Sequence, residues 1–168
     1  MALVAQLPES SQCIVIEDGV LDHMAQHRQL AWYSREAGGQ LFGSISANEV
    51  VVCVARGPYR GDQRWRFSYR SNRKAAQRAI DELSGKGLVY LGEWHTHPEE
   101  HPVASAADHD AMLRLMAAST TKSSSLLMLI QGRVSGVNGL ALYSSDPKGL
   151  TRWQLSAAEH ALPEATGP

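Results

Sequence analysis

Two histidines separated by one residue, His95 and His97, follow an apolar segment and precede a proline. At the end of a strand, residues two apart project from the same face, so both imidazoles point to one place. Asp108 follows in the first turn of the next expected helix, and a short loop can return that turn to the strand end. Two imidazoles and one carboxylate suit Zn²⁺, and three protein ligands leave a fourth position for water. The sequence therefore predicts a catalytic metal centre between residues 95 and 108.

The same residues allow a simpler interpretation. Ser105 and Asp108 are three apart before an apolar run, which is the pattern of a helix capping box. His109 and Asp110 lie beside Asp108, and the broad apolar arc of this helix does not choose among them. His23 and His27, four apart, are expected on a solvated helix face. The conjunction of His-x-His, a proline and Ser-x-x-Asp favours the metal site over capping alone.

The elements that must position these residues follow from periodicity and capping signals. We expect helices over 18–32, from a Ser71-Asn72 cap to about 83, and over 105–118. We expect strands over 12–17, 40–46, 50–55, 64–70, 88–94, 125–131, 140–143 and 152–155. This interleaving predicts an α/β domain (α+β layered) with a mixed, largely antiparallel sheet flanked by helices. One domain should span residues 1–155, followed by a loosely ordered tail over 156–168.

Composition excludes several classes of protein. The 168 residues are 43% hydrophobic and 20% charged, as in a globular domain, with a formal net charge of −1. That balance gives no electrostatic basis for binding nucleic acid or a membrane. Two isolated cysteines exclude a disulfide framework and a cysteine zinc ribbon. The sequence shows neither a signal peptide nor an apolar run of about 18 residues, so we expect a cytoplasmic protein.

One segment, residues 56–78, is strongly basic and carries aromatic residues. Strict alternation over 64–70 predicts a strand whose aromatic side chains pack inward and whose arginines are solvated. The aromatic set is Trp65, Phe67 and Tyr69, and the basic set is Arg64, Arg66 and Arg70. An acidic protein partner is an alternative use of this surface, and a single-stranded nucleic-acid platform is a less favoured one.

The spacing His95-x-His97, seven residues, then Ser105-x-x-Asp108 resembles the signature of the JAMM (JAB, MPN+) metalloproteases. Glu36, just before a glycine-rich strand, resembles the upstream glutamate of that signature. The resemblance implies the JAMM/MPN, cytidine-deaminase-like fold and one zinc ion per chain, held by His95, His97 and Asp108. It also implies that Glu36 is the general acid/base, that Ser105 helps to hold the oxyanion, and that the bond hydrolysed is an amide. Glu93 would orient a metal ligand from outside the coordination shell.

Further motifs resemble a bacterial subset of the family found in CBASS anti-phage operons. They are Gly57-Pro58-x-x-Gly61-Asp62, the basic start of the helix after Asn72, and Gly-Glu-Trp-His-Thr-His-Pro over 92–98. This implies an isopeptidase that removes a cGAS-like nucleotidyltransferase from its targets. The partner would be a protein with an extended C-terminal tail, ubiquitin-like or CD-NTase-type, bound near Arg64, Arg66 and Arg70. The alternatives are a processing peptidase for a sulfur-carrier protein and an inactive MPN scaffold. No oligomeric state is predicted.

Overall fold

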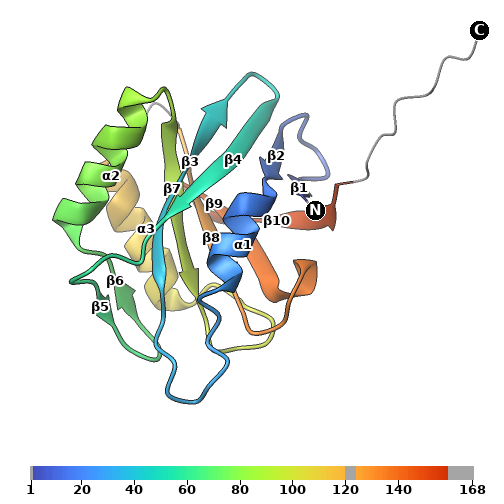
Figure 1. The fold of residues 1–168 in the computed structure, drawn as a ribbon. Coiled ribbons are helices and arrows are strands. Elements are labelled where there is room, and N and C mark those ends of the chain that lie inside the picture. Colours follow the sequence, from blue (N-terminus) through green and yellow to red (C-terminus); the bar gives the residue numbers. More distant parts are fainter. Residues whose placement is uncertain (1, 120–123, 159–168) are drawn as a thin grey trace, which may run out of the picture.

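The computed structural model describes residues 2–119 and 124–158, and its strands form a closed barrel (Figure 1). Eight strands are hydrogen-bonded in the order β1-β10-β9-β8-β7-β3-β4-β2, and β2 pairs back with β1. The pairs β2–β4 and β7–β8 are parallel and the others are antiparallel. The barrel strands are β1 (Leu3–Gln6), β2 (Cys13–Ile16), β3 (Gly38–Ile45), β4 (Glu49–Arg56), β7 (Val89–Thr96), β8 (Leu126–Gln131), β9 (Leu140–Asp146) and β10 (Gly149–Ala157).

The mixed α/β class is confirmed, but the expected layered sheet flanked by helices is instead a closed barrel. The sheet closes because β1, a strand that the sequence analysis missed, bridges β2 and β10. Four residues are too few for a clear periodic signal, although Leu3 and Ala5 alternate inward. Closure removes two sheet edges that would otherwise expose unpaired backbone groups.

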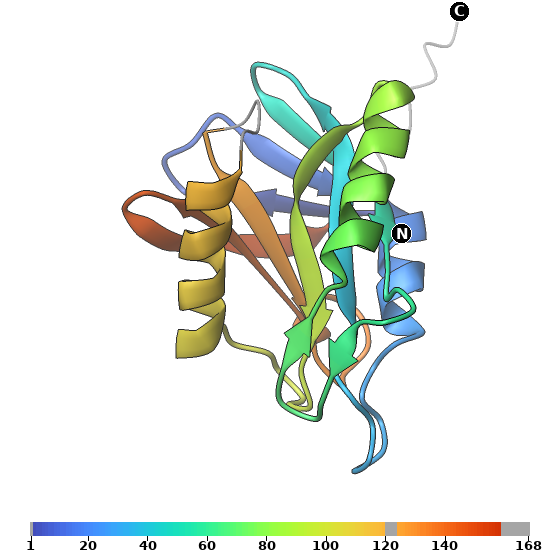
Figure 2. The same ribbon diagram turned by 90° about the vertical axis from the view of Figure 1, so that its left-hand side faces the viewer.

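Three helices pack against this barrel: α1 (Asp18–Ala25), α2 (Arg73–Gly85) and α3 (Ala106–Ala118). Val20 and Met24 of α1 join the main core cluster. Helices α2 and α3 cover the outer face of the sheet, where Tyr90 packs partly against the cluster under each of them (Figure 2). No helix in the described ranges is long and apolar enough to cross a membrane.

Most predicted elements are confirmed, with two corrections near the functional residues. Helix α1 ends at Ala25 rather than near Trp32. Leu30, one of the apolar residues that suggested a longer helix, and Trp32, at the expected end of that helix, lie exposed in a loop over residues 26–37. In the tail, β10 continues to Ala157, and residues 159–168 lie outside the described part of the chain.

The second correction concerns residues 64–70, which form a small hairpin instead of one strand. Its two-residue strands are β5 (Gln63–Arg64) and β6 (Tyr69–Arg70). Trp65 and Phe67 are 55% and 72% exposed, so the predicted inward packing of these aromatic residues is wrong. The chain reverses within the alternating segment, and alternation alone does not reveal such a turn.

A bulge in β7 decides which side chains reach the outer face of the barrel. Across β3 the register shifts so that Leu41 pairs with Gly92 and Phe42 with Tyr90. Gly92 has a φ of 146°, and a Cβ there would lie 2.0 Å from the carbonyl oxygen of Leu127. Glycine is therefore required at this close approach of β8. Beyond it Trp94 points into the core, which leaves its neighbours Glu93 and His95 on the opposite face.

Candidate metal centre

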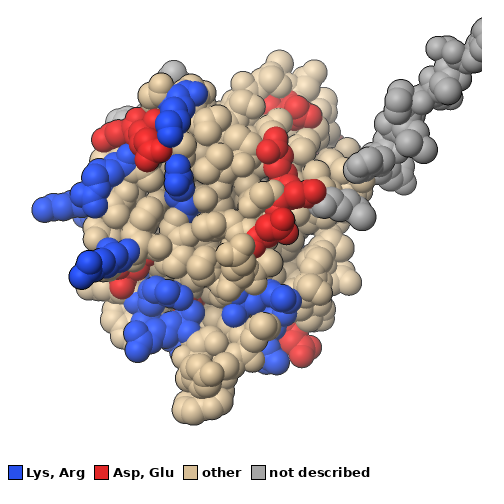
Figure 3. All heavy atoms as spheres, in the orientation of Figure 1, with Lys and Arg blue, Asp and Glu red and all other residues tan. Residues whose placement is uncertain are grey.

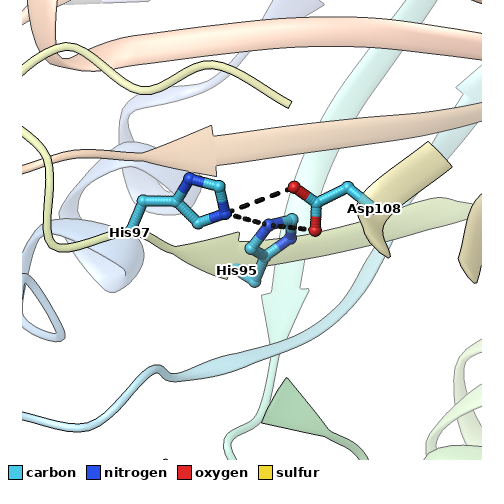
Figure 4. A group of neighbouring side chains, drawn as sticks. All are labelled: His95, His97 and Asp108. Atoms are coloured by element: carbon cyan, nitrogen blue, oxygen red, sulfur yellow. Dashed lines mark hydrogen bonds and ion pairs between the residues drawn. The ribbon is translucent and has the colours of Figure 1, made fainter. Parts of the chain in front are cut away.

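His95, His97 and Asp108 converge at the end of β7 (Figure 4). The Nε2 atoms of His95 and His97 lie 3.0 Å apart. Asp108 places Oδ1 3.1 Å from His95 Nε2 and Oδ2 3.3 Å from His97 Nε2. Within the described residues, this is the group of His, Cys, Asp and Glu side chains that could hold a metal ion. His109, the nearby alternative, is exposed.

The two histidines are placed by strand geometry. His95 is in β7, and the N–H of His97 donates to the carbonyl oxygen of Gln131 in β8, 2.9 Å away. Thr96 between them points inward and is fully buried. The strand face that carries the two histidines is therefore held by the hydrogen bonds between β7 and β8.

Asp108 is placed by the start of α3. Ser105 is the N-cap, and its Oγ accepts a hydrogen bond from Asp108 N at 3.2 Å. Asp108 Oδ2 in turn accepts from Ser105 N at 2.7 Å and from Ser105 Oγ at 2.8 Å. The capping box and the metal cluster thus coexist, because the bonds that cap the helix also turn the carboxylate toward the histidines.

The donor atoms fit a tetrahedral Zn²⁺ site. The 3.0 Å between His95 Nε2 and His97 Nε2 is close to the edge of a tetrahedron whose vertices lie about 2 Å from its centre, the usual zinc–ligand distance. The Asp108 carboxylate lies within 3.1–3.3 Å of these nitrogens, with a different oxygen facing each one. Nδ1 of His97 is buried without a hydrogen bond, and Glu99 Oε2 is 3.4 Å from it. A carboxylate on the far nitrogen of a metal-binding histidine orients the ring and makes it a better ligand.

The charges of the cluster are mutually stabilising. Burial favours the neutral form of Asp108, but hydrogen bonds from His95 and His97 hold its pKa well below the usual range. Burial also disfavours the protonated form of His97. The hydrogen bond to Asp108 and the charge of that carboxylate outweigh burial, so the pKa of His97 is raised. The site is therefore built around a carboxylate that stays ionised and attracts a cation.

Glu36 lies beside this cluster, two residues before the start of β3. Gly38 pairs with His95 across the sheet, and Thr96 N donates to the carbonyl oxygen of Ala37 at 2.8 Å. The same antiparallel register brings Glu36 next to His97. Glu36 is 5% exposed, and burial raises its pKa to about 8, with smaller effects from the charges of His97 and Asp108.

Glu93 bonds away from the cluster. Its carboxylate accepts hydrogen bonds from Tyr90 Oη at 2.7 Å and from Gln40 Nε2 at 2.8 Å. Gln40 Oε1 accepts from Tyr59 Oη at 2.7 Å, in the segment that precedes the β5–β6 hairpin. Burial raises the pKa of Glu93 to about 7. These bonds join β7 to β3 and to the segment before the hairpin.

The arginines predicted to bind substrate have different environments. Arg64 Nε donates to the carbonyl oxygen of Glu36 at 2.6 Å, and Arg66 donates to that of Trp32. Both are partly buried, so the expected solvated face is wrong for these two, whereas Arg70 is exposed. Lys and Arg side chains gather over the lower part of this face, where the hairpin lies (Figure 3). A shallow groove there is lined by Trp32, Tyr33, Arg35, Arg64, Trp65 and Arg66.

The histidines outside the cluster lie in two different environments. His23 and His27 are half-buried and pack their rings on Trp94, so the predicted solvated face is wrong. His101 is exposed, and its Nδ1 lies 2.8 Å from the carbonyl oxygen of Asn138. Sequence analysis also missed Gln29, a fully buried amide near Glu36. The residues around Gln29 gave no sign that its side chain is buried, because two of its hydrogen-bond partners, Arg66 and Thr96, lie far away in the sequence.

Comparisons with known proteins show the family of the chain. Residues 17–156 match the family described as prokaryotic homologs of the JAB domain. A Vibrio cholerae protein named CD-NTase/cGAS isopeptidase is 35% identical over 130 residues, which cover 74% of this chain and 80% of that protein. An Escherichia coli protein of the same name is 32% identical over 123 residues, 71% of this chain and 76% of that protein.

The fold has a counterpart among solved structures. The solution structure of a Desulfitobacterium hafniense protein superposes with a TM-score of 0.60 at 22% identity, covering 82% of this chain and 87% of that one. The predicted resemblance is confirmed: the chain belongs to the prokaryotic branch of the JAB family and is a relative of the CD-NTase/cGAS isopeptidases.

Proposed function

We propose that this chain is a zinc-dependent isopeptidase of CBASS anti-phage defence. It would hydrolyse the amide bond that joins the C-terminal tail of a cGAS-like nucleotidyltransferase to a target protein. The relatives named CD-NTase/cGAS isopeptidase support the substrate class. The observation that carries the chemistry is the convergence of His95, His97 and Asp108 beside the buried carboxyl of Glu36.

His95, His97 and Asp108 would hold one zinc ion through two nitrogens and a carboxylate oxygen. A bound Zn²⁺ supplies Lewis acidity toward the scissile carbonyl and makes water acidic enough to lose a proton near neutral pH. Glu36 takes the proton of the attacking water and returns it to the amine nitrogen as the carbon–nitrogen bond breaks. In the metal-free protein, burial raises the pKa of this carboxyl to about 8, so the site favours a carboxyl that can hold a proton near neutral pH.

Ser105 has an exposed position at the mouth of the site. We assign its hydroxyl to the negative charge that develops on the carbonyl oxygen during attack. In the resting protein that hydroxyl bonds to Asp108, so Ser105 also orients a metal ligand. Glu93 would stiffen β7 under His95 through Tyr90 and Gln40.

The substrate tail would approach beside the β5–β6 hairpin. Arg70 is exposed there, and Arg64 and Arg66 fix the hairpin against the segment that carries Glu36. An extended tail bound through its main chain would present its last carbonyl to the metal site. The free thiols of Cys13 and Cys53 suit the reducing cytoplasm, where we place the enzyme.

Cleavage of a purified conjugate tests the proposal directly. The wild-type chain should release the nucleotidyltransferase from its target, lose this activity with a strong chelator and regain it with zinc. Metal analysis should find one zinc ion per chain. Glu36→Gln should retain zinc but lose turnover, whereas Glu100→Gln, the same change at an exposed position, should remain active.

The outcomes separate the alternatives. Cleavage that survives complete removal of metal would refute the zinc chemistry, and full activity of Glu36→Gln would refute the role of that carboxyl. Activity only on C-terminally extended sulfur-carrier proteins would replace the isopeptidase with a processing peptidase. A chain without zinc or activity would be a binding scaffold.

A further inference from the structure

Gln29, in the loop after α1, is a buried amide that no part of the proposed reaction uses. The residue is 2% exposed, although glutamine is usually found at the surface. The loop runs to the same end of the barrel as the β5–β6 hairpin (Figures 1 and 2). Burying an amide costs free energy unless each polar group finds a partner, so its contacts indicate what holds it there.

The three hydrogen bonds of this amide go to its own loop, to the β5–β6 hairpin and to β7. Its Nε2 donates to the carbonyl oxygen of Ser34 at 3.2 Å and to that of Arg66 at 2.9 Å. Its Oε1 accepts from Thr96 Oγ1 at 3.2 Å. Since carbonyl oxygens only accept, the Nε2 side must face the loop and hairpin, and the orientation of the amide is fixed.

Thr96 extends this connection to the residue after Glu36. Its Oγ1 accepts a hydrogen bond from Ala37 N at 3.0 Å, while its own N–H donates to the carbonyl oxygen of Ala37. Thr96 separates His95 from His97 in sequence. The Gln29 amide is therefore bonded to the residue between the two histidines, and through it to the segment that carries Glu36.

The β5–β6 hairpin also binds the backbone of Glu36 directly. Glu36 N donates to the carbonyl oxygen of Trp65 at 2.7 Å, and Arg64 Nε donates to that of Glu36 at 2.6 Å. Because Gln29 also binds Arg66, it joins the hairpin to the strand that carries the histidines. All the hydrogen bonds of Gln29 can therefore form together only when the loop over 26–37, the β5–β6 hairpin and β7 have their folded positions.

We infer that Gln29 is a positioning residue that fixes Glu36 relative to the metal-binding strand. The inference rests on the proposed function, because it assigns Gln29 to the placement of the general acid/base. Proton transfer requires a heavy-atom distance of about 2.6–3.2 Å, so a small shift of the Glu36 backbone would slow it. Gln29 contacts none of the three metal ligands by the hydrogen bonds described above, so its loss should leave metal binding intact.

Gln29→Ala and Gln29→Glu test this assignment. The alanine variant removes all three bonds, and the glutamate variant places an oxygen against the carbonyls of Ser34 and Arg66. Both should keep one zinc ion per chain. Both should lower kcat by about 10- to 100-fold, since misplacement of a reacting group by about 1 Å can cost that much.

Trp153→Phe is the control for lost stability. Trp153 in β10 is 7% exposed, and its Nε1 donates to Ser144 Oγ in β9 at 2.9 Å. This hydrogen bond involves neither the metal cluster nor the segment that carries Glu36. The variant should lose stability through the missing hydrogen bond and the smaller side chain, and should keep kcat within about twofold of wild type. An equal loss of kcat in Trp153→Phe and Gln29→Ala would mean general destabilisation and would overturn the assignment.

Thr96 provides a rescue test and a readout that does not depend on turnover. Thr96→Val removes the hydroxyl and should reproduce the effect of Gln29→Ala, whereas Thr96→Ser retains it and should keep kcat. In the metal-free protein, Gln29→Ala should speed hydrogen exchange at Ala37 N by about tenfold or more, reporting local opening. Unchanged exchange with unchanged kcat would refute the inference. Failure of the wild type to cleave any conjugate would instead refute the proposed function, while the exchange measurement would still test the contacts.

Discussion

Glu36→Gln should change how the stability of the metal-free protein depends on pH. Burial raises the pKa of Glu36 from 4.5 to about 8, so the fold favours the neutral carboxyl over the charged one. A carboxyl whose pKa is raised by folding stabilises the protein fully below its unfolded pKa, and this contribution is lost as pH rises through the folded pKa. Wild type should therefore weaken between pH 4.5 and about 8 relative to the neutral amide variant.

The size of the effect follows from the pKa difference. Each pKa unit is worth about 1.4 kcal/mol, so the complete change from 4.5 to about 8 would correspond to about 5 kcal/mol. Relaxation of the fold and entry of water around the charged Glu36 carboxylate reduce this cost. We therefore expect the variant to gain about 1–3 kcal/mol over wild type across this range.

Urea unfolding of both proteins, freed of metal by chelation, measures this difference at a series of pH values. The substitution also adds a constant offset, because it exchanges an acid for an amide. The prediction therefore concerns how the difference in the free energy of unfolding between the two proteins changes with pH, and not its absolute value. Glu100→Gln makes the same chemical change on an exposed side chain and should give a nearly flat difference, within about 0.5 kcal/mol.

If the stability of Glu36→Gln relative to wild type stays constant or falls as the pH rises, the reasoning is refuted. Such a result would mean that the fold does not penalise the charged carboxylate, and that Glu36 is more hydrated or better paired than its burial indicates.

Three other substitutions test the local structure around the site. Ser105→Ala removes a hydroxyl that bonds to Asp108 Oδ2, so zinc affinity should fall by about 10- to 100-fold in a competition assay with a chelating dye; unchanged affinity would remove Ser105 from the positioning of that ligand. Asn72→Ala removes the side chain that accepts two backbone N–H groups at the start of α2, and should cost about 1 kcal/mol in urea unfolding; a neutral result would show that water caps the helix equally well. Gly39→Ala would place a Cβ 1.8 Å from a backbone oxygen of β4, and should cost more than about 3 kcal/mol, while Gly85→Ala, with open space around its Cβ, should not destabilise; equal stability of the two variants would contradict the close approach of the strands.

Local patterns were sufficient where one segment carries the whole signal. The apolar segment before His95 predicted a strand, and the Ser-x-x-Asp spacing predicted a capped helix. The spacing of the two histidines is enough to put them on one face of a strand, since strand side chains alternate. These predictions concern atoms only a few bonds apart, so tertiary packing had little freedom to change them.

Local patterns failed where a segment's environment comes from distant residues. Strict alternation over 64–70 predicted one strand with inward aromatic side chains, whereas the chain turns there and exposes Trp65 and Phe67. Two of its arginines, Arg64 and Arg66, find partners in the loop over 26–37, whose first part, 26–32, the apolar periodicity had assigned to a helix. Tertiary contacts can override local propensity in this way when they satisfy more backbone and side-chain groups.

By itself, the sequence determined which residue types are available for hydrolysis and how two of them share a strand face. Only the tertiary structure decided that β1 closes the sheet into a barrel, that Glu36 lies beside His97, and that Gln29 joins three segments behind them. The physical reason is that periodicity and capping are properties of neighbouring residues. The distance between Glu36 and His97 depends instead on strand register and on a buried amide, whose partners meet only after the chain has folded.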